Sequence, residues 1–207
     1  AKRELRREAR AKRDDVPLVA IVGYTNAGKS SLLNRLCARR EGADEVYADD
    51  LLFATLDPTV RLLRLPGGRE CHLADTVGFI QKLPTKLVSA FRATIEVACD
   101  ADIVLHVVDA SSPIGRQQAV SVQKILGEIG AGGTLQIVAL NKADVVVEET
   151  GELPSVAEWT ALLDGMDGGE GAGTAGSGGG GLRVRAVPIS ATRGNNLPKL
   201  LRAIETA

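Results

Sequence analysis

The chain has 207 residues, of which 44% are hydrophobic and 25% charged, and its formal net charge is −1. This length predicts one α/β domain with a sizeable core, and the near-neutral charge argues against a generally basic nucleic-acid-binding body. No run of about 18 apolar residues is present, so we expect no membrane span. The odd number and wide spacing of the cysteines fit neither a disulfide framework nor a zinc site, which indicates a reducing compartment.

The first fifteen residues differ from the rest in charge. They hold seven Lys or Arg against four Asp or Glu, a net +3 that leaves −4 for the remainder. Strong helix formers, few apolar positions and the absence of Gly and Pro predict a polar helix over residues 1–13, which Pro17 ends. Such a helix is typical of a connector or of one half of a helical pair. The chain does not begin with Met, so we interpret it as a fragment or a processed form.

Beyond Pro17, short apolar runs alternate with segments of helical pattern. We predict strands over residues 18–22, 60–65, 70–74, 103–108, 135–140 and 183–189, and helices over 30–40, 86–99, 116–129, 155–163 and 197–204. Because strands that alternate with helices form parallel sheets covered on both faces, the sequence predicts a six-stranded, doubly wound α/β sheet. The Pro-Gly-Gly link at residues 66–68 makes the second and third strands an antiparallel hairpin at one edge.

One segment departs from this alternation. Residues 165–181 contain ten glycines in 17 residues and little that could be buried. This composition predicts a flexible linker or inserted loop within a domain of residues 16–207. A docking loop is the functional alternative.

The first predicted strand runs into GYTNAGKS at residues 23–30, and a helix follows. This is the G-x-x-x-x-G-K-[ST] loop in its strand–loop–helix context, which predicts a site for a nucleoside triphosphate. Backbone N–H groups of the loop and of the helix N-terminus would surround the β-phosphate. Lys29 would reach the β- and γ-phosphates, and the Ser30 hydroxyl would ligate Mg²⁺. The contact candidates are Gly23, Tyr24, Thr25, Asn26, Ala27, Gly28, Lys29, Ser30 and the adjoining Ser31.

The third predicted strand ends in the D-x-x-G sequence Asp75, Thr76, Val77 and Gly78. Asp75 would hold Mg²⁺ through water, because hard cations prefer oxygen ligands and retain solvent. The N–H of Gly78 would meet the γ-phosphate. Lys29 and Gly78 are therefore candidate catalytic residues.

The fifth predicted strand ends in the sequence NKAD, residues 141–144. Asp144 can accept from both N1–H and the 2-amino group of guanine, a donor pair that adenine lacks. Asn141 can meet the purine edge, the Lys142 stem can cover the ring, and the N–H of Ala191 can donate to guanine O6. The carboxyl ends of parallel strands meet at one edge, where such sheets bind ligands. This order of motifs predicts the Ras-like GTPase form of the P-loop NTPase fold, with base-site candidates Asn141, Lys142, Ala143, Asp144, Ser190, Ala191 and Thr192.

The segment LLFATLDPT, residues 51–59, lies between the first helix and the second strand. Two of its residues, Thr55 and Thr59, have hydroxyls that could ligate Mg²⁺. The neighbouring candidates for nucleotide contact are Phe53, Ala54, Leu56 and Asp57.

The residue after Gly78 is Phe79, where Ras-like GTPases have a glutamine that positions water. A phenyl ring can neither orient nor deprotonate water, so we expect slow intrinsic hydrolysis. Asn26 admits two interpretations. It could help to hold a K⁺ ion beside the phosphates, which would offset charge that develops in the transition state, or it could only brace the loop through hydrogen bonds to the backbone. Both interpretations stay open at this point.

Taken together, GYTNAGKSSLLNRL, LLFATLDPT, DTVGFIQKLP, HVVDAS at residues 106–111, NKAD and ISA resemble the G domain of the HflX family of ribosome-associated GTPases, over residues 16–201. The resemblance implies GTP hydrolysis with Mg²⁺ and binding to the large ribosomal subunit and its rRNA, with a role in splitting or rescuing stalled ribosomes. It favours Thr55 as the Mg²⁺ ligand and catalytic residue, and Thr59 as the start of a strand. It also implies that residues 1–15 are the stub of a helical linker domain.

We therefore predict a monomeric GTPase switch that acts on the ribosome. The cytoplasm is the expected compartment, or a chloroplast or mitochondrion in a eukaryote, since residues 75–94 are similar to plastid relatives. One alternative is a GTPase that acts on a non-ribosomal assembly. The other is a nucleotide-binding module with negligible hydrolysis.

Overall fold

The structure is a computed structural model that describes residues 16–37, 59–79, 95–164 and 184–207. The predicted polar helix, most of the LLFATLDPT segment and the glycine-rich segment fall outside these ranges. The proposed division into a stub of residues 1–15 and a domain of residues 16–207 stays a prediction.

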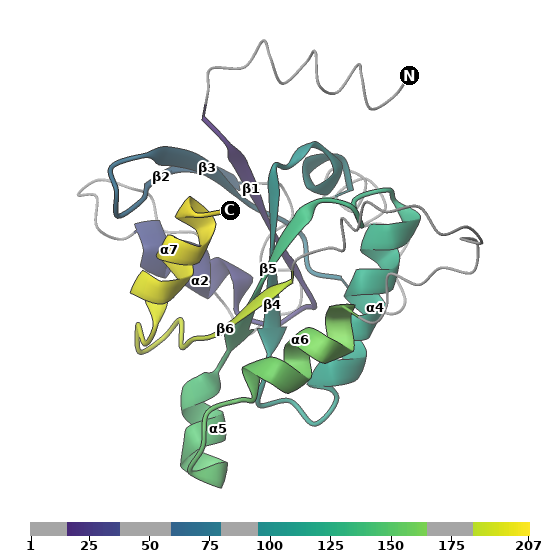
Figure 1. Cartoon of the computed structure of the whole chain (residues 1–207), viewed down its shortest axis with the longest axis vertical. Helices are drawn as coiled ribbons and strands as arrows, with labels where there is room; N and C mark the ends of the chain where they lie inside the picture. Colours follow the sequence, from purple (N-terminus) through teal and green to yellow (C-terminus); the bar gives the residue numbers. More distant parts are fainter. Residues whose placement is uncertain (1–15, 38–58, 80–94, 165–183) are drawn as a thin grey trace, which may run out of the picture.

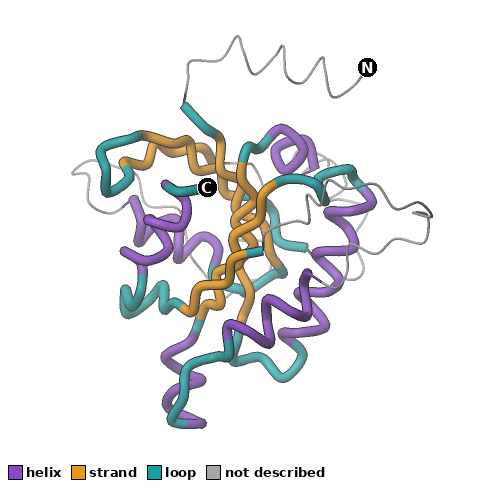
Figure 2. Tube along the Cα trace, viewed as in Figure 1, coloured by secondary structure: helices purple, strands orange, loops and turns teal. Residues whose placement is uncertain are grey.

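The described strands form one sheet in the order β2-β3-β1-β4-β5-β6 (Figures 1 and 2). All neighbours are parallel except β2 and β3, which pair antiparallel at one edge. The sequence prediction of a mainly parallel sheet with an antiparallel edge is therefore confirmed. The strands are β1 (Leu18–Gly23), β2 (Thr59–Arg64), β3 (Glu70–Asp75), β4 (Ile103–Asp109), β5 (Leu135–Asn141) and β6 (Arg185–Pro188).

Helices cover the two faces of this sheet. In Figure 1, α2 and α7 lie on one side, and α4 and α6 lie on the other. Residues 95–100 are also helical and overlap the C-terminal part of the second predicted helix, which ends one residue earlier in the prediction. The named helices are α2 (Lys29–Cys37), α4 (Gly115–Glu128), α5 (Ala143–Thr150), α6 (Val156–Asp164) and α7 (Leu197–Glu205).

The helix α5 was not predicted from the sequence. It contains three consecutive valines, Val145, Val146 and Val147, and β-branched residues favour strands over helices. Its ends explain why it forms nevertheless. Asp144 places a negative charge in the first turn, where it interacts favourably with the helix dipole, and Gly151 provides a C-cap.

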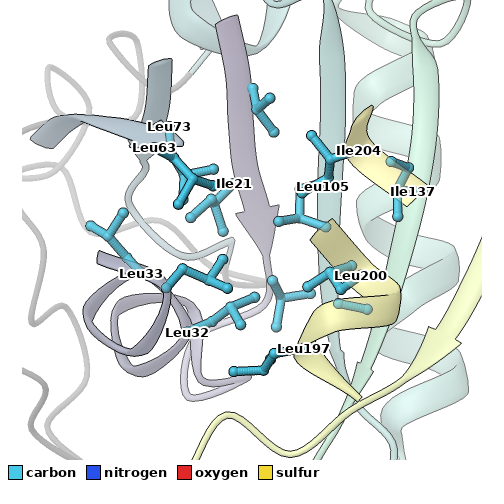
Figure 3. Packing of buried hydrophobic residues seen from close by; sticks show 14 of the residues in the cluster. Ile21, Leu32, Leu33, Leu63, Leu73, Leu105, Ile137, Leu197, Leu200 and Ile204 are labelled. Atoms are coloured by element: carbon cyan, nitrogen blue, oxygen red, sulfur yellow. The ribbon is translucent and has the colours of Figure 1, made fainter. Parts of the chain in front are cut away.

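The largest core cluster lies between the sheet and the pair α2 and α7 (Figure 3). Leu32 and Leu33 of α2 pack here with Leu200 of α7 and with Ile21 of β1, and all four side chains are buried. Two smaller clusters lie on the α4 and α6 side. Apolar side chains on both faces of β1, β4 and β5 thus hold the central strands in place.

The strand register brings the carboxyl ends of β1, β4 and β5 to one edge. Gly23 pairs with Val107 of β4, and Asp109 pairs with Asn141 of β5. The loops that follow these strands must therefore lie next to one another, which places the sequence motifs in a single site.

No helix in the described ranges is long and apolar enough to cross a membrane.

Candidate nucleotide site

The loop of residues 23–30 joins β1 to α2 and is shaped by close contacts at its glycines. Gly28 has a φ of +90°, and a Cβ there would lie 2.2 Å from Nδ2 of Asn141. Only glycine combines this backbone conformation with so close an approach. The loop thus holds its backbone against the β5 end, with the N-terminus of α2 directed into the site.

Lys29 begins α2 and is almost fully buried, with 7% of its surface exposed. Its Nζ donates to the carbonyl oxygen of Tyr24 at 3.0 Å. Burial lowers the pKa of Lys29 to about 8, while the nearby charge of Asp75 opposes this shift. A phosphate group would stabilise the charged ammonium much as Asp75 does, so this lysine is suited to an anionic ligand.

Gly78 lies beside this lysine. A Cβ at Gly78 would be 2.9 Å from Nζ of Lys29 and 2.8 Å from Cγ2 of Thr25. A larger residue here would push the lysine and the loop apart. The structure therefore brings Gly78 next to the phosphate loop, as the D-x-x-G motif predicts.

The pair Ser30 and Asp75 provides oxygen ligands at the same place. Oγ of Ser30 donates to Oδ2 of Asp75 at 2.8 Å, and Asp75 is fully buried at the end of β3. The next residue is anchored as well, since Oγ1 of Thr76 donates to the carbonyl oxygen of Ile21 at 2.6 Å. A hydroxyl beside a carboxylate fits a hard divalent cation such as Mg²⁺. Within the described residues, no group of three or more His, Cys, Asp or Glu offers a competing metal site.

Phe79 turns away from this site. Its N–H donates to the carbonyl oxygen of Gly23, and its carbonyl oxygen accepts from the N–H of Thr25, both at 3.0 Å. The side chain is 1% exposed and packs in the cluster that contains Ala20 and Val22. The ring therefore belongs to the core, and it supplies no polar group to the phosphates.

Asn141 ties the two halves of the site together. Its Nδ2 donates to the carbonyl oxygen of Ala27, and its Oδ1 accepts from the N–H of Ala191, both at 2.9 Å. The sequence analysis predicted that the N–H of Ala191 can donate to guanine O6. In the structure, it donates to Oδ1 of Asn141. The amide nitrogen of Asn141 carries a second hydrogen, which could donate to a purine edge.

Lys142 is held by an aspartate that the sequence analysis did not assign to the site. Its Nζ lies 2.7 Å from Oδ2 of Asp109, and Oδ1 of Asp109 accepts from the N–H and Oγ of Ser111. Asp109 ends β4 directly beside Asn141. Its place at the carboxyl end of a strand, in the HVVDAS run, was the available signal.

Asp144 has one oxygen engaged and one without a partner. Its Oδ2 lies 3.1 Å from Nε of Arg193, which also contacts Glu148. Its Oδ1 is buried and has no hydrogen-bond partner among the described residues. A buried acceptor without a donor is unfavourable, so this oxygen is suited to a ligand N–H. Arg193 and Glu148 carried no recognisable motif, and the sequence analysis missed both.

The structure describes some of the remaining predicted residues, and others lie outside its described ranges. Ala143 and Val77 are buried next to the site, and the N–H of Ala143 donates to the carbonyl oxygen of Ile189. Ser31 follows Ser30 in α2, and Oγ1 of Thr192 lies 3.2 Å from Oγ of Ser190. Thr59 begins β2, as predicted. The other candidates of this segment lie outside the described residues: Phe53, Ala54, Thr55, Leu56 and Asp57.

Comparisons with known proteins find similar GTPases. A family model described as a 50S ribosome-binding GTPase matches residues 18–142. The GTPase HflX of Caldanaerobacter subterraneus subsp. tengcongensis is 53% identical over 144 residues, which are 70% of this chain and 32% of that protein. The GTPase HflX of Escherichia coli K12 is 46% identical over 144 residues, with the same coverage of 70% and 32%. The chain thus spans about a third of the length of these curated relatives.

The fold is similar to that of solved nucleotide-binding proteins. A GTP-binding protein from the hyperthermophilic archaeon Sulfolobus solfataricus, solved in complex with GDP, superposes with a TM-score of 0.64 at 26% sequence identity. The match covers 99% of this chain and 56% of that one.

Proposed function

Because the chain belongs to the 50S ribosome-binding GTPase family and, within it, to the HflX GTPases, we propose that it binds GTP with Mg²⁺ and hydrolyses it to GDP and phosphate. The observation that carries this proposal is that Oδ1 of Asp144, at the base end of the site, is buried and has no hydrogen-bond partner within the part of the chain that the structure describes. Guanine presents two adjacent N–H donors, N1–H and the 2-amino group, to such a carboxylate. Adenine presents an acceptor, N1, instead, and would leave the carboxylate facing another acceptor.

At the phosphate end, this chain's residues bind and neutralise charge. The backbone N–H groups of the loop and of the α2 N-terminus would donate to the phosphates. Lys29 contributes a positive charge, and because its side chain is already buried, little further free energy is needed to remove water from it when the phosphates bind. Ser30 and Asp75, with Thr55 when the GTP state forms, would hold Mg²⁺. When bound, the cation neutralises charge on the phosphate oxygens.

We expect the intrinsic rate of hydrolysis to be low. Phe79 packs in the core and supplies no group that could orient water. We infer that positioning and charge stabilisation by Lys29, Thr55, Gly78 and the cation account for the rate of the isolated chain.

A monovalent cation is one source of additional charge. The Asn26 side chain is exposed and therefore accessible to an ion. That Asn26 only braces the loop is the alternative, which the comparison of K⁺ with Na⁺ tests. We propose that Asn26 helps to hold K⁺ beside the phosphates. K⁺ should then accelerate turnover more than the smaller Na⁺ does, and Asn26→Ala should remove the difference. Equal rates in matched KCl and NaCl would exclude this role.

The choice between the two threonines can be tested in the same assay. Thr55→Ala should weaken the Mg²⁺-dependent preference for triphosphate over GDP and spare the affinity for GDP. If Thr59→Ala alone produces that pattern, the assignment of Thr55 is wrong.

We propose the large ribosomal subunit and its rRNA as the partner, and ribosome splitting or rescue as the role of the whole protein. The support is the family model and the two relatives, which this chain matches over a third of their length. Such a partner implies action in the cytoplasm or, in a eukaryote, in a chloroplast or mitochondrion. We expect the free protein to be a monomer.

The decisive experiment measures phosphate release by the chain alone, with purified 50S particles, and with 30S particles as the matched control. We expect slow release alone, and faster release with 50S particles only. No release under any condition would indicate a nucleotide-binding module without hydrolysis. Equal release with and without 50S particles, together with no co-sedimentation, would indicate a non-ribosomal partner.

A further inference from the structure

An arginine of the loop between β6 and α7 contacts the base-recognition carboxylate. Nε of Arg193 lies 3.1 Å from Oδ2 of Asp144, and Nη2 of the same guanidinium contacts Glu148. Asp144 and Glu148 are four residues apart on α5, so their side chains lie on one face of the helix. One planar guanidinium thus bridges two carboxylates of neighbouring turns.

The two ends of this bridge differ in exposure. The Asp144 side chain is 8% exposed, whereas the Arg193 and Glu148 side chains are each 56% exposed. Arg193 therefore approaches Asp144 from the solvent side and uses Oδ2. The buried Oδ1 is left without a partner among the described residues.

Arg193 belongs to a loop with a fixed backbone. Its N–H donates to Oγ of Ser190 at 3.1 Å, and the next residue, Gly194, donates to the carbonyl oxygen of Ser190 at 2.8 Å. Ala191 of the same loop is tied to Asn141. The position of the guanidinium is thus coupled to the loop that faces the base.

A carboxylate oxygen has two acceptor positions. Nε of Arg193 occupies one position on Oδ2 and leaves the other open, so the ion pair and a bound guanine are compatible. A free carboxylate rotates about its χ2 bond, which has broad energy minima. The contact of Arg193 with Glu148 holds the guanidinium in place, so its ion pair with Asp144 limits this rotation and restricts the orientation of the carboxylate plane.

We propose that Arg193 is a positioning residue for guanine recognition, and that it fixes the Asp144 carboxylate so that both oxygens accept from the base at once. The proposal rests on the guanine-nucleotide binding proposed above. A base with two donors binds more tightly to a carboxylate of fixed orientation, because both hydrogen bonds can form at once. A base with one donor can form its single hydrogen bond even when the carboxylate rotates. Arg193 should therefore favour guanine over hypoxanthine, which has N1–H but no 2-amino group.

The test measures the dissociation constants of GDP and inosine diphosphate for the 207-residue chain by calorimetry. In Arg193→Ala, we expect the affinity for GDP to fall by about three- to fivefold, in the upper part of the range for a partly exposed ion pair. The affinity for inosine diphosphate should change less, so the preference for GDP should fall by a similar factor. Tighter GDP binding would show that Arg193 competes with the base, and equal losses for both nucleotides would show a merely structural role. Either result overturns the proposal.

Three further variants make the result specific. Arg193→Lys retains the charge without the planar fork, and it should lose most of the same preference. Arg202→Ala removes an arginine of α7 whose side chain makes no hydrogen bond or ion pair to another described residue, and the preference should stay at the wild-type value. In an Asp144→Asn background measured with xanthosine diphosphate, Arg193→Ala should have no effect, because the ion pair is already absent.

The failure of this inference can be distinguished from the failure of the proposed function. If the wild-type chain does not prefer GDP to inosine diphosphate, the guanine assignment itself is wrong. If the wild type has the preference and Arg193→Ala retains it in full, only the role of Arg193 is refuted.

Discussion

The phosphate end and the base end of the site are built by different means. At the phosphate end, the contacts run through the backbone of the loop: the carbonyl and N–H of Phe79 pair with Thr25 and Gly23, and the backbone of Gly28 lies against the side chain of Asn141. At the base end, ion pairs between side chains hold the recognition residues: the largely buried Asp109 holds Lys142, and the exposed Arg193 holds Asp144.

This difference predicts different responses to change. The phosphate end should depend on the absence of side chains at its glycines, because there is no room for a Cβ. The base end should depend on the identity of side chains, and changes there should alter selectivity more than stability. Ion pairs with one exposed partner contribute little to folding, but they can set the geometry of a binding group.

The largest effect is expected for Gly28→Ala. The new Cβ would lie 2.2 Å from Nδ2 of Asn141 at a φ of +90°, so the loop or Asn141 must move, and the hydrogen bonds of Asn141 to Ala27 and Ala191 are lost. We expect about 3–5 kcal/mol less stability in chemical denaturation, and no measurable GDP binding. The control Gly127→Ala adds a Cβ in open space on α4 and should stabilise by up to about 1 kcal/mol. Wild-type binding by Gly28→Ala would contradict the close contact.

The next largest effect concerns selectivity. Asp144→Asn replaces an acceptor by a donor where guanine offers only donors, so GTP affinity should fall about a hundredfold and xanthosine triphosphate should be preferred. Competition binding measures this exchange. Asp164→Asn, on the exposed end of α6, is the matched control and should leave selectivity unchanged. A variant at Asp144 that still preferred GTP would remove the basis for the guanine assignment.

These two variants also show how much the sequence could predict. The sheet, its antiparallel edge and the phosphate loop follow from local signals, namely apolar runs, a Pro-Gly-Gly turn and glycine spacing. The backbone-built end of the site is therefore largely visible in the sequence. The contacts of Arg193 with Asp144 and of Asp109 with Lys142 join residues of different strands and loops. The position of Asp109 at the end of a strand indicates that it lies near the site, but no local pattern indicates which residue it contacts, and Arg193 has no local signal at all. The sequence analysis missed α5 because its three consecutive valines favour a strand. Its first-turn aspartate, its glycine C-cap and its place in the fold favour a helix instead.

Histidine 106 is another residue whose role depends on tertiary structure. The sequence analysis leaves His106 outside the site, and the structure buries it on β4 beside Val22 and Val138. Its Nδ1 has no partner among the described residues. Burial, with the charge of Lys29 as a lesser cause, lowers the pKa of His106 to about 4. The core beneath the phosphate end therefore contains a neutral imidazole.

The buried imidazole of His106 predicts how the free energy of unfolding changes at acidic pH. The unfolded chain takes up a proton at His106 near pH 6.5, whereas the folded chain does so only near pH 4. Stability from this residue is thus complete above about pH 6.5 and is lost as the pH falls toward 4, by about 2–3 kcal/mol. The free energy of unfolding of His106→Asn, measured from pH 4 to 7 without nucleotide, should have a smaller slope than that of the wild type. Identical slopes would show that His106 has the same pKa in the folded and unfolded chains, which contradicts the shift caused by burial.

The smallest effect is expected at Asp109, and it sharpens the comparison within the base end. Asp109→Asn keeps an acceptor for Ser111 but removes the charge that holds Nζ of Lys142 at 2.7 Å. The Lys142 stem would then spend less time over the ring, and we expect about threefold weaker binding. Because the stem covers the ring face and does not contact the 2-amino group, GDP and inosine diphosphate should weaken equally. Arg193→Ala should instead change the ratio of the two affinities. If Asp109→Asn also changes this ratio, the carboxylate and the lysine stem are not independent parts of the base site.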